Sequence, residues 1–339
     1  METTILRTTD LFTALAPEWN ALLHNSTADT PFLTHEWQCT WWQCLCEGEL
    51  FVITVRDSGA LVGLAPLFIL KQAGETGLRR LLRLIGSVDA SDYLDLIAMR
   101  GREHEVFSAI LDVLTQSTEW DVLDLYNVPA ASATRSILPA LAAERGWKLT
   151  DETQVVCPII TLPPVFDDYV QSLDKKERHE LRRKLRRAEG TEGLTWYAIT
   201  ADDHTHDLDE AAEAFINLMM KSRSDKSDFM TERMRRFFHQ MIHAAHAGGF
   251  LHLSFLEVNG VKAATYLSFD YCHKRLVFNS GLETTGFQSL SAGIVLVARM
   301  IEDAIAKGYS EFDFLRGDEE YKYRLGAKDT WIYHVAVER

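Results

Sequence analysis

The sequence predicts an α/β protein with mixed sheets, built from two tandem units. In each half of the chain two strands meet at a tight turn, a third strand and an amphipathic helix follow, and a last strand ends the series. A stretch at 157–166 contains three of the eight prolines and reads as a strand followed by a linker. We therefore place the first unit at 1–160 and the second at 161–339.

The second half carries the clearest pattern. Asn259-Gly260 joins two strands, because these residues adopt the positive φ angles of a tight hairpin turn. Apolar residues then recur at helical spacing, and Gly308 ends that helix. The expected elements are strands at 251–258, 261–270 and 275–281, a helix at 291–307 and a strand at 311–315.

The first half repeats this order with weak sequence identity. Ser58-Gly59 forms its turn, and an Asp lies inside the last strand of each half, at Asp124 and Asp313. We interpret the halves as a duplicated unit; the alternative is that unrelated hairpins lie at similar spacing. The expected elements are strands at 50–57, 60–70 and 93–99, a helix at 103–116 and a strand at 120–128.

Composition argues against several classes of protein. The chain of 339 residues has a net charge of −14, so a general nucleic-acid-binding surface requires positive charge that is concentrated locally. The odd number of cysteines, five, and the lack of a secretory signal in the first residues predict a reduced, cytoplasmic protein. No apolar run reaches the roughly 18 residues that a membrane span needs.

A glycine-containing loop leads into the helix at 291–307. The start of a helix exposes backbone N–H groups and the positive end of the helix dipole, which together suit a phosphate or pyrophosphate. The loop is therefore a candidate anion site.

This loop, 288–293, reads Gln-Ser-Leu-Ser-Ala-Gly. It resembles the pyrophosphate loop of the Gcn5-related N-acetyltransferases (GNAT), Gln/Arg-x-x-Gly-x-Gly/Ala, with Ser291 in place of the first glycine. With "DYLDL" at 92–96, the basic stretch 175–187 and "FDFLRGDEEYKYRLGA" at 312–327, nearly the whole chain resembles one branch of that superfamily. The branch holds acetyltransferases associated with cellulose and exopolysaccharide biosynthesis, and is similar to the tandem Fem-type transferases that use aminoacyl-tRNA.

The resemblance implies two tandem GNAT-like units and an N-acyltransferase. An amine would attack acyl-CoA directly, without a covalent enzyme intermediate, and the acceptor would be a small-molecule amine or a nucleotide-linked compound of polysaccharide or envelope metabolism. One alternative is an aminoacyl-tRNA donor, which the replaced glycine and the basic stretch favour. Another is a noncatalytic docking partner of a polysaccharide-synthesis complex. The donor-binding candidates are Gln288, Ser289, Ser291, Ala292 and Gly293.

Asp313 and Tyr321 are the candidate catalytic residues. Asp313 alternates with Phe312 and Phe314 and so points to the opposite side of the strand, where partial burial would suit a base. Alternatively it accepts backbone N–H groups from a neighbouring loop. In the GNAT superfamily a Tyr beyond this strand often protonates the departing sulfur, and the resemblance gives that role to Tyr321.

Further candidates concern the substrate. Arg316 and Lys322 would hold its carboxylate or phosphate, or else form a salt-bridge network with the acidic residues at 318–320. In the first half, Asp92, Tyr93 and Asp95 begin a strand and would orient a cationic amine; a turn cap and a structural carboxylate are the alternative.

The stretch 174–189 predicts a basic helix. Eight Lys or Arg against four Asp or Glu give it a net charge of +4, and apolar residues recur only at i, i+4 and i+7. The alternative to anion binding is a solvated helix with intrahelical ion pairs. The candidates for contacting tRNA, a nucleotide-linked precursor or an anionic head group are Arg182, Arg183 and Arg186, together with Arg187.

His239, His243 and His246 share one helix face at a spacing that resembles zinc ligation. The aromatic residues of this helix fall on the opposite side, and charged residues accompany the histidines. We therefore interpret the face as solvent-exposed and predict no metal site.

Overall fold

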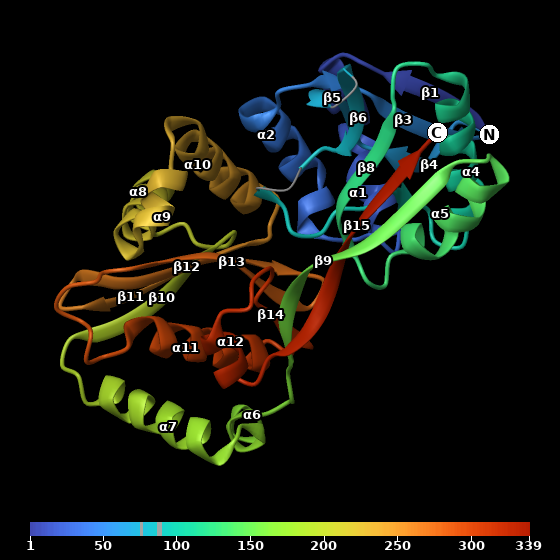
Figure 1. Ribbon diagram of the computed structural model, residues 1–339. Helices are drawn as coiled ribbons and strands as arrows, with labels where there is room; N and C mark the ends of the chain where they lie inside the picture. Colours follow the sequence, from blue (N-terminus) through green and yellow to red (C-terminus); the bar gives the residue numbers. More distant parts are fainter. Residues whose placement is uncertain (75–76, 87–89) are drawn as a thin grey trace. The chain divides into compact units, whose positions relative to one another are not determined.

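The computed structural model describes residues 1–74, 77–86 and 90–339, and the chain forms two compact units (Figure 1). One unit comprises Met1–Val155 with Trp331–Arg339, and the other comprises Val156–Thr330. The final segment, which the sequence predicts in the second unit, therefore packs with the first. Two strands, β9 (Lys148–Thr161) and β15 (Lys328–Glu338), contribute residues to both units.

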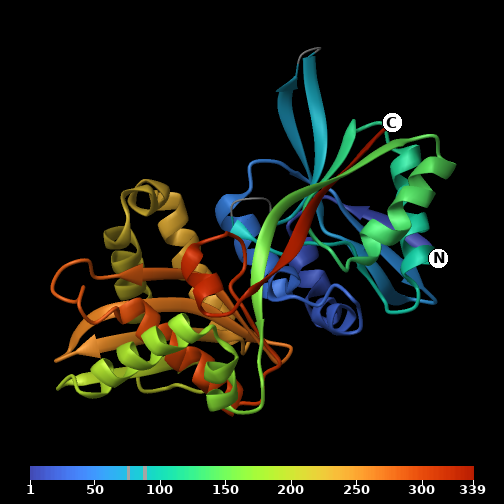
Figure 2. The same cartoon turned by 60° about the horizontal axis from the view of Figure 1, so that its bottom comes forward.

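The first unit contains two groups of paired strands. One has the order β1-β3-β4-β7, and the other has the order β2-β5-β6-β8-β15. The β5–β6 hairpin projects from the rest of this unit (Figure 2). The elements of the unit, besides parts of β9 and β15, are β1 (Glu2–Leu6), α1 (Asp10–His24), the short 3-10 helix η1 (Pro31–Leu33), α2 (His35–Leu45), β2 (Glu49–Leu50), β3 (Val52–Asp57), β4 (Ala60–Ala65), β5 (Leu67–Gly74), β6 (Gly77–Leu84), β7 (Ile97–Ala98), α4 (Glu103–Gln116), β8 (Val122–Pro129) and α5 (Ala133–Glu144).

The structure confirms the first hairpin and corrects the strand after it. Ser58 and Gly59 have φ angles of 49° and 87° at the turn between β3 and β4. The strand predicted at 93–99 is reduced to β7, which pairs with β4. The strand that runs parallel to β8 is instead β6, which the sequence did not predict because its arginines obscure the apolar alternation.

The second unit is a sheet in the order β10-β11-β12-β13-β14-β9, in which only β13 and β14 are parallel. Helices α8 and α10 cover one face of it, and α11 and α7 lie on the other (Figure 1). The elements, besides β9 and β15, are α6 (Phe166–Ser172), α7 (Lys175–Glu189), β10 (Leu194–Thr200), α8 (Leu208–Ser222), α9 (Ser224–Phe229), α10 (Glu232–Ala247), β11 (Leu251–Val258), β12 (Val261–Tyr271), β13 (Lys274–Leu282), α11 (Ala292–Ala306), β14 (Glu311–Asp313) and α12 (Glu320–Arg324).

The elements predicted for the second half are confirmed, except that the last strand, predicted at 311–315, ends at Asp313. Asn259 and Gly260 have φ angles of 50° and 78° between β11 and β12, as a tight turn of this type requires. Gly308, with a φ of 75°, follows the end of α11. Each unit has a helical crossover of the same kind. In the first unit α4 leads into β8, which runs parallel to β6, and in the second unit α11 leads into β14, which runs parallel to β13.

The parallel pairing of β13 with β14 is short. It covers Lys274–Leu276 opposite Glu311–Asp313, and β14 ends there while β13 continues to Leu282. The two strands therefore part beyond Leu276, on the side of the sheet where the loop into α11 begins. Across the described ranges, none of the helices has the length and apolar character that a bilayer span requires.

Candidate active site

The first turn of α11 provides the backbone N–H groups of the candidate site. Ser291 is its N-cap residue, with a left-handed backbone (φ 56°), and the first N–H groups of a helix have no partner within it. A Cβ atom on Gly293 would lie 2.9 Å from the Leu282 side chain and 3.7 Å from the hydroxyl oxygen of Tyr266. A larger residue at 293 would therefore fill the space between the helix start and Tyr266.

The loop before α11 is exposed at Gln288 and Ser289. The Gln288 amide donates to the carbonyl oxygen of Thr284, and the Arg187 guanidinium of α7 donates to the carbonyl oxygen of Ser289. These two contacts use loop carbonyl groups, and no described side chain caps the helix start. The Ile294 N–H donates to the Ser291 carbonyl oxygen at 2.9 Å, so the N–H groups that an anion would meet first are those of Ala292 and Gly293. Arg187 also adds a positive charge beside the loop, which favours an anion there.

Tyr321 and Tyr266 share a hydrogen bond between their hydroxyl groups, from α12 and β12 respectively. Burial raises the pKa of Tyr321 far above its ordinary value, and burial also raises the pKa of Tyr266. Both phenols therefore stay protonated at neutral pH and can act as proton or hydrogen-bond donors. The Tyr321 ring is held edge-on against Phe314, with ring centroids 5.8 Å apart.

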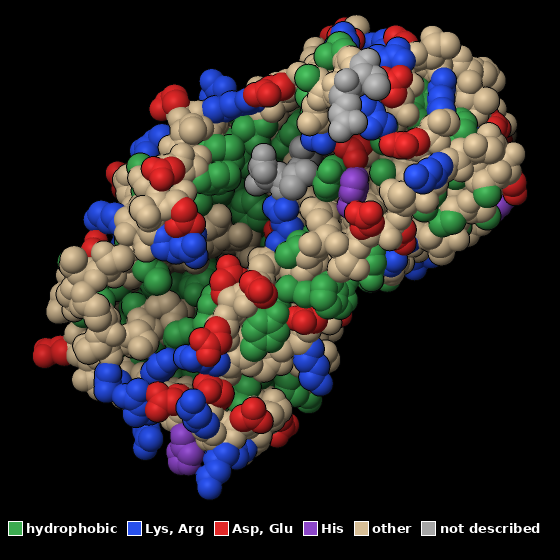
Figure 3. All heavy atoms as spheres, viewed as in Figure 1, with side chains coloured by type: hydrophobic (Ala, Val, Ile, Leu, Met, Phe, Trp, Pro, Cys, Tyr) green, Lys and Arg blue, Asp and Glu red, His purple; other side chains and the backbone are tan. Residues whose placement is uncertain are grey.

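A pocket of about 280 Å³ opens beside Tyr321 in the second unit. Three basic and two acidic side chains line it with apolar residues, and Lys and Arg side chains gather over α7 at the lower left of Figure 3, among Asp and Glu. The pocket therefore offers charged partners for a polar substrate. Its lining residues are Lys176, Glu177, Glu180, Leu181, Lys184, Ile294, Tyr321, Arg324 and Leu325.

Comparison with protein families identifies this region. Residues 175–323 match the model described as "Acetyltransferase (GNAT) domain", a range that includes the α11 loop, Tyr266 and Tyr321. This part of the chain is a GNAT acetyltransferase domain. No curated protein matches the chain in sequence.

Solved structures extend the fold of the GNAT domain to the whole chain. FemX superimposes with a TM-score of 0.68 at 13% identity, over 98% of this chain and 97% of FemX. L-PGS from Bacillus licheniformis gives 0.56 at 11% identity, over 95% and 91%. A tandem GNAT protein from the clavulanic acid biosynthesis pathway gives 0.50 at 12% identity, over 99% and 98%. The chain thus has a tandem GNAT fold over nearly its whole length, as its sequence predicts.

Asp313 lies on the other side of the sheet from the tyrosines of the GNAT domain. Phe312 and Phe314 belong to the core under α11, so Asp313, between them, points away from it. It is 3% exposed, and its Oδ1 accepts the Leu315 N–H at 2.7 Å. This contact is the alternative that the sequence left open, and the role of Asp313 as a base stays a prediction.

Lys226 of α9 is a further candidate, which the sequence does not indicate. Its Nζ donates to Asn279 Oδ1 at 2.9 Å and to the Ser280 carbonyl oxygen at 2.6 Å, in the part of β13 beyond its pairing with β14. Burial and the nearby Arg223 lower the pKa of Lys226 to about 8, while Glu319 opposes the shift. The amine is therefore partly neutral near pH 8 and able to accept a proton. Only the folded chain brings α9 to β13, so no local sequence signal marks this residue.

Lys322 supports the α12 turn of the GNAT domain. It is 3% exposed and donates to the carbonyl oxygens of Arg316 and Gly317 at 2.9 and 3.0 Å. Its ammonium also lies 2.8 Å from Glu319. Although burial acts in the opposite direction, the hydrogen bond from Lys322 keeps the pKa of Glu319 below its ordinary value. These contacts fit the salt-bridge alternative for Lys322 better than a role as a substrate-binding cation. Arg316, the other candidate, is partly buried.

The structure confirms the basic helix as α7, with Leu181, Leu185 and Ala188 as its buried seam. Its candidate arginines differ in their contacts. Only Arg187 reaches the α11 loop among the four, because the others are engaged along α7 or with α6. Arg182 contacts Asp167, Arg183 contacts Glu180, and Arg186 donates to the carbonyl oxygen of Arg182.

The first-unit candidates are largely buried, and Tyr93 and Asp95 line a small pocket of about 70 Å³. Asp92, Tyr93 and Asp95 are 5%, 9% and 5% exposed. Asp95 accepts hydrogen bonds from the hydroxyl groups of Ser132 and Thr134, at the start of α5. Asp95 therefore anchors a helix terminus, which is the structural alternative, and a role in orienting an amine stays a prediction for this group.

Proposed function

We propose that the chain is an N-acyltransferase that moves an acyl group from acyl-CoA to an amine in polysaccharide or envelope metabolism. The observation that carries this proposal is the position of the Tyr266 hydroxyl beside Gly293, in the first turn of α11, with Tyr321 bonded to it. An anionic carrier held by the first turn of α11 would place its acyl end near a proton donor. Arg187 adds a positive charge at the same loop.

In the proposed reaction the neutral amine attacks the thioester carbonyl carbon. A C–N bond forms, the C–S bond breaks, and Tyr321 gives its proton to the departing sulfur before regaining one from water. The attacking nitrogen loses its extra proton to a base, for which Asp313 is the candidate from the sequence and Lys226 the candidate from the structure. Tyr321 stays protonated throughout the neutral range and is therefore present as a donor, although the pKa raised by burial also makes it a weaker acid than an exposed tyrosine.

A thermal-shift experiment with the full chain tests the donor. A ligand that binds only the folded protein raises the melting temperature, so acetyl-CoA at saturating concentration should raise it and free adenosine should not. Acetyl-CoA with a panel of amines should then release free thiol in proportion to N-acetylated product, measured by mass spectrometry. Acetyl-CoA that neither binds nor is consumed would contradict the proposal.

A second function is an aminoacyl-tRNA-dependent transfer. Two features favour it. The stretch 174–189, which contains α7, has eight Lys or Arg and only four Asp or Glu, and Ser291, with a left-handed backbone, replaces a glycine of the loop motif. The likeness to FemX is compatible with it but concerns the fold alone. Charged tRNA should then raise the melting temperature where acetyl-CoA does not, and its affinity should fall steeply with salt. Intact protein that binds neither donor would point instead to a noncatalytic docking partner.

A further inference from the structure

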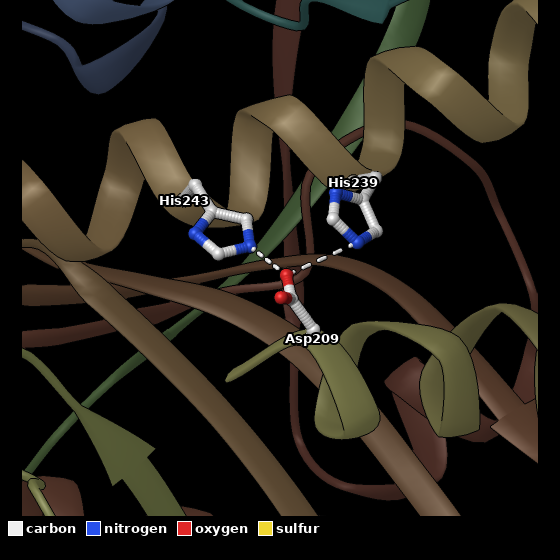
Figure 4. A group of neighbouring side chains, drawn as sticks. All are labelled: Asp209, His239 and His243. Atoms are coloured by element: carbon white, nitrogen blue, oxygen red, sulfur yellow. Dashed lines mark hydrogen bonds and ion pairs between the residues drawn. The ribbon is translucent and has the colours of Figure 1, made fainter. Parts of the chain in front are cut away.

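Helices α8 and α10 bring three metal-ligating side chains together on the second unit, away from the α11 loop. His239 and His243 lie one turn apart on α10, and Asp209 is the second residue of α8. The sequence showed the two histidines but not Asp209, because only the packing of α8 on α10 places the carboxylate between them (Figure 4). This contact changes the interpretation of the histidine face as mere solvent surface.

The geometry of the three groups matches a small coordination sphere. Asp209 Oδ1 lies 2.7 Å from His243 Nε2 and 3.4 Å from His239 Nε2 (Figure 4), and the three ligand atoms lie within 4.8 Å of one another. With zinc–ligand distances of about 2.0 to 2.1 Å, tetrahedral donor atoms lie about 3.3 Å apart. The two distances from Asp209 bracket that value, and the histidine nitrogens lie within 4.8 Å of each other, so rotation of the side chains would bring the three donors to that spacing.

Both sides of the cluster are held in place by the fold. Asp207 caps α8, and its Oδ1 accepts the N–H groups of Asp209 and Glu210 at 2.9 and 3.1 Å. On α10, the histidines lie opposite a buried face that includes Phe238 and Met241, so the packing of that face sets which side of the helix the two histidines occupy. The backbone on both sides is therefore preorganised, and only side-chain torsions need to adjust.

The ligand set indicates the class of metal. Two imidazole nitrogens and one carboxylate oxygen suit zinc and similar transition-metal ions, whereas magnesium and calcium prefer oxygen ligands alone. Asp209 is 69% exposed and the two histidines are 33% and 42% exposed, so an ion has access and a fourth position stays open to water. The carboxylate also supplies a negative charge that partly balances a divalent cation.

We propose that Asp209, His239 and His243 bind a zinc ion that ties the start of α8 to α10. Without the ion the same groups form the histidine–carboxylate contacts seen in Figure 4. This site differs in position and chemistry from the proposed acyl-transfer site at the start of α11. Either proposal can therefore fail without the other.

The test is calorimetric titration of zinc chloride into the full chain, stripped of metal and of any affinity tag, near pH 7.5. One zinc ion should bind per chain, magnesium should not bind, and zinc should raise the melting temperature. Cobalt(II) should show the visible absorption of a tetrahedral site. His239→Ala, His243→Ala and Asp209→Asn should each weaken zinc binding by tenfold or more.

His246→Ala is the matched control, because His246 lies on the same helix but outside the cluster. It should leave zinc affinity within twofold of the unchanged protein. Two results would overturn the proposal. One is the absence of saturable zinc binding at 100-fold excess over protein, and the other is an equal loss of affinity in His246→Ala and His243→Ala. Circular dichroism of each variant checks that these exposed substitutions leave the helices folded.

Discussion

The hydroxyl groups of Tyr321 and Tyr266 are joined by a hydrogen bond, and Tyr266 lies beside Gly293 at the start of α11. Three separate elements, β12, α11 and α12, therefore meet at this pair of hydroxyl groups, which lies next to apolar core residues. A buried phenol pair that stays protonated is useful where a leaving group needs a proton, and costly in a core unless each hydroxyl is partnered.

Tyr321→Phe should lower turnover about 100-fold, since general acid catalysis contributes on the order of 10² to 10⁴ in rate. The change removes the hydroxyl and keeps the ring that packs on Phe314. Acetyl-CoA turnover with an accepted amine measures the effect. Tyr323→Phe is the control, because Tyr323 lies on the same helix and donates outward to Asp329. Equal turnover in the two variants would remove Tyr321 from the mechanism.

Arg187→Gln should weaken donor binding about tenfold, which is the effect of about 1.4 kcal/mol, because it removes the cation beside the α11 loop. Arg182→Gln is the matched control, since Arg182 lies on the same helix and contacts Asp167 instead. Titration calorimetry at two salt concentrations gives the affinities. A similar loss in both variants would assign the effect to the general charge of α7.

Asp313→Asn and Lys226→Met separate the two candidate bases. The asparagine side chain keeps an oxygen to accept the Leu315 N–H but cannot take a proton, so a catalytic Asp313 requires a large fall in turnover at nearly unchanged melting temperature. Lys226 accepts a proton only when neutral, so as a base it would make kcat/KM rise with pH through about 8, and Lys226→Met would abolish that rise. If turnover and its pH profile survive in both variants, neither residue is the base.

Local signals in the sequence predict much of the second unit. The positive φ angles of Asn259 and Gly260 follow from residue type, and the apolar period of α11 with Gly308 behind it fixes a helix. Strand β6 escapes such reasoning, because Arg79, Arg80 and Arg83 interrupt its alternation. The structure pairs these arginines with Glu338, Asp121 and Asp124, which come from separate parts of the chain.

The candidate site shows the same division. The anion loop and Tyr321 follow from a linear motif, whereas the partner of Tyr321 lies in β12 and no spacing rule connects the two. Lys226 and Asp209 likewise gain their neighbours only through packing. Lys322 illustrates the converse, because a cation in a charged stretch reads as exposed, yet the fold buries it against backbone carbonyls.

Asp95 predicts a pH dependence of stability in the first unit. Burial raises the pKa of Asp95 from 3.8 to about 6, against the hydrogen bonds from Ser132 and Thr134. The folded chain therefore binds the Asp95 proton more tightly than the unfolded chain does. The stabilisation from this proton is complete below about pH 4 and is lost as the pH rises through 6. The difference is on the order of 3 kcal/mol, because each pKa unit corresponds to about 1.4 kcal/mol.

Asp95→Asn isolates this contribution, because asparagine keeps an acceptor for one hydroxyl and does not titrate. Urea unfolding of both proteins from pH 4 to pH 7 gives the two free energies of unfolding. The free energy of the unchanged protein should fall relative to that of the variant between pH 4 and pH 6, and the difference should be constant above pH 7. Parallel curves across the whole range would mean that Asp95 is ionised with an ordinary pKa despite its burial. The hydroxyl groups at the start of α5 would then bind an ionised Asp95. Its negative charge would be available for the predicted role of orienting a cationic amine.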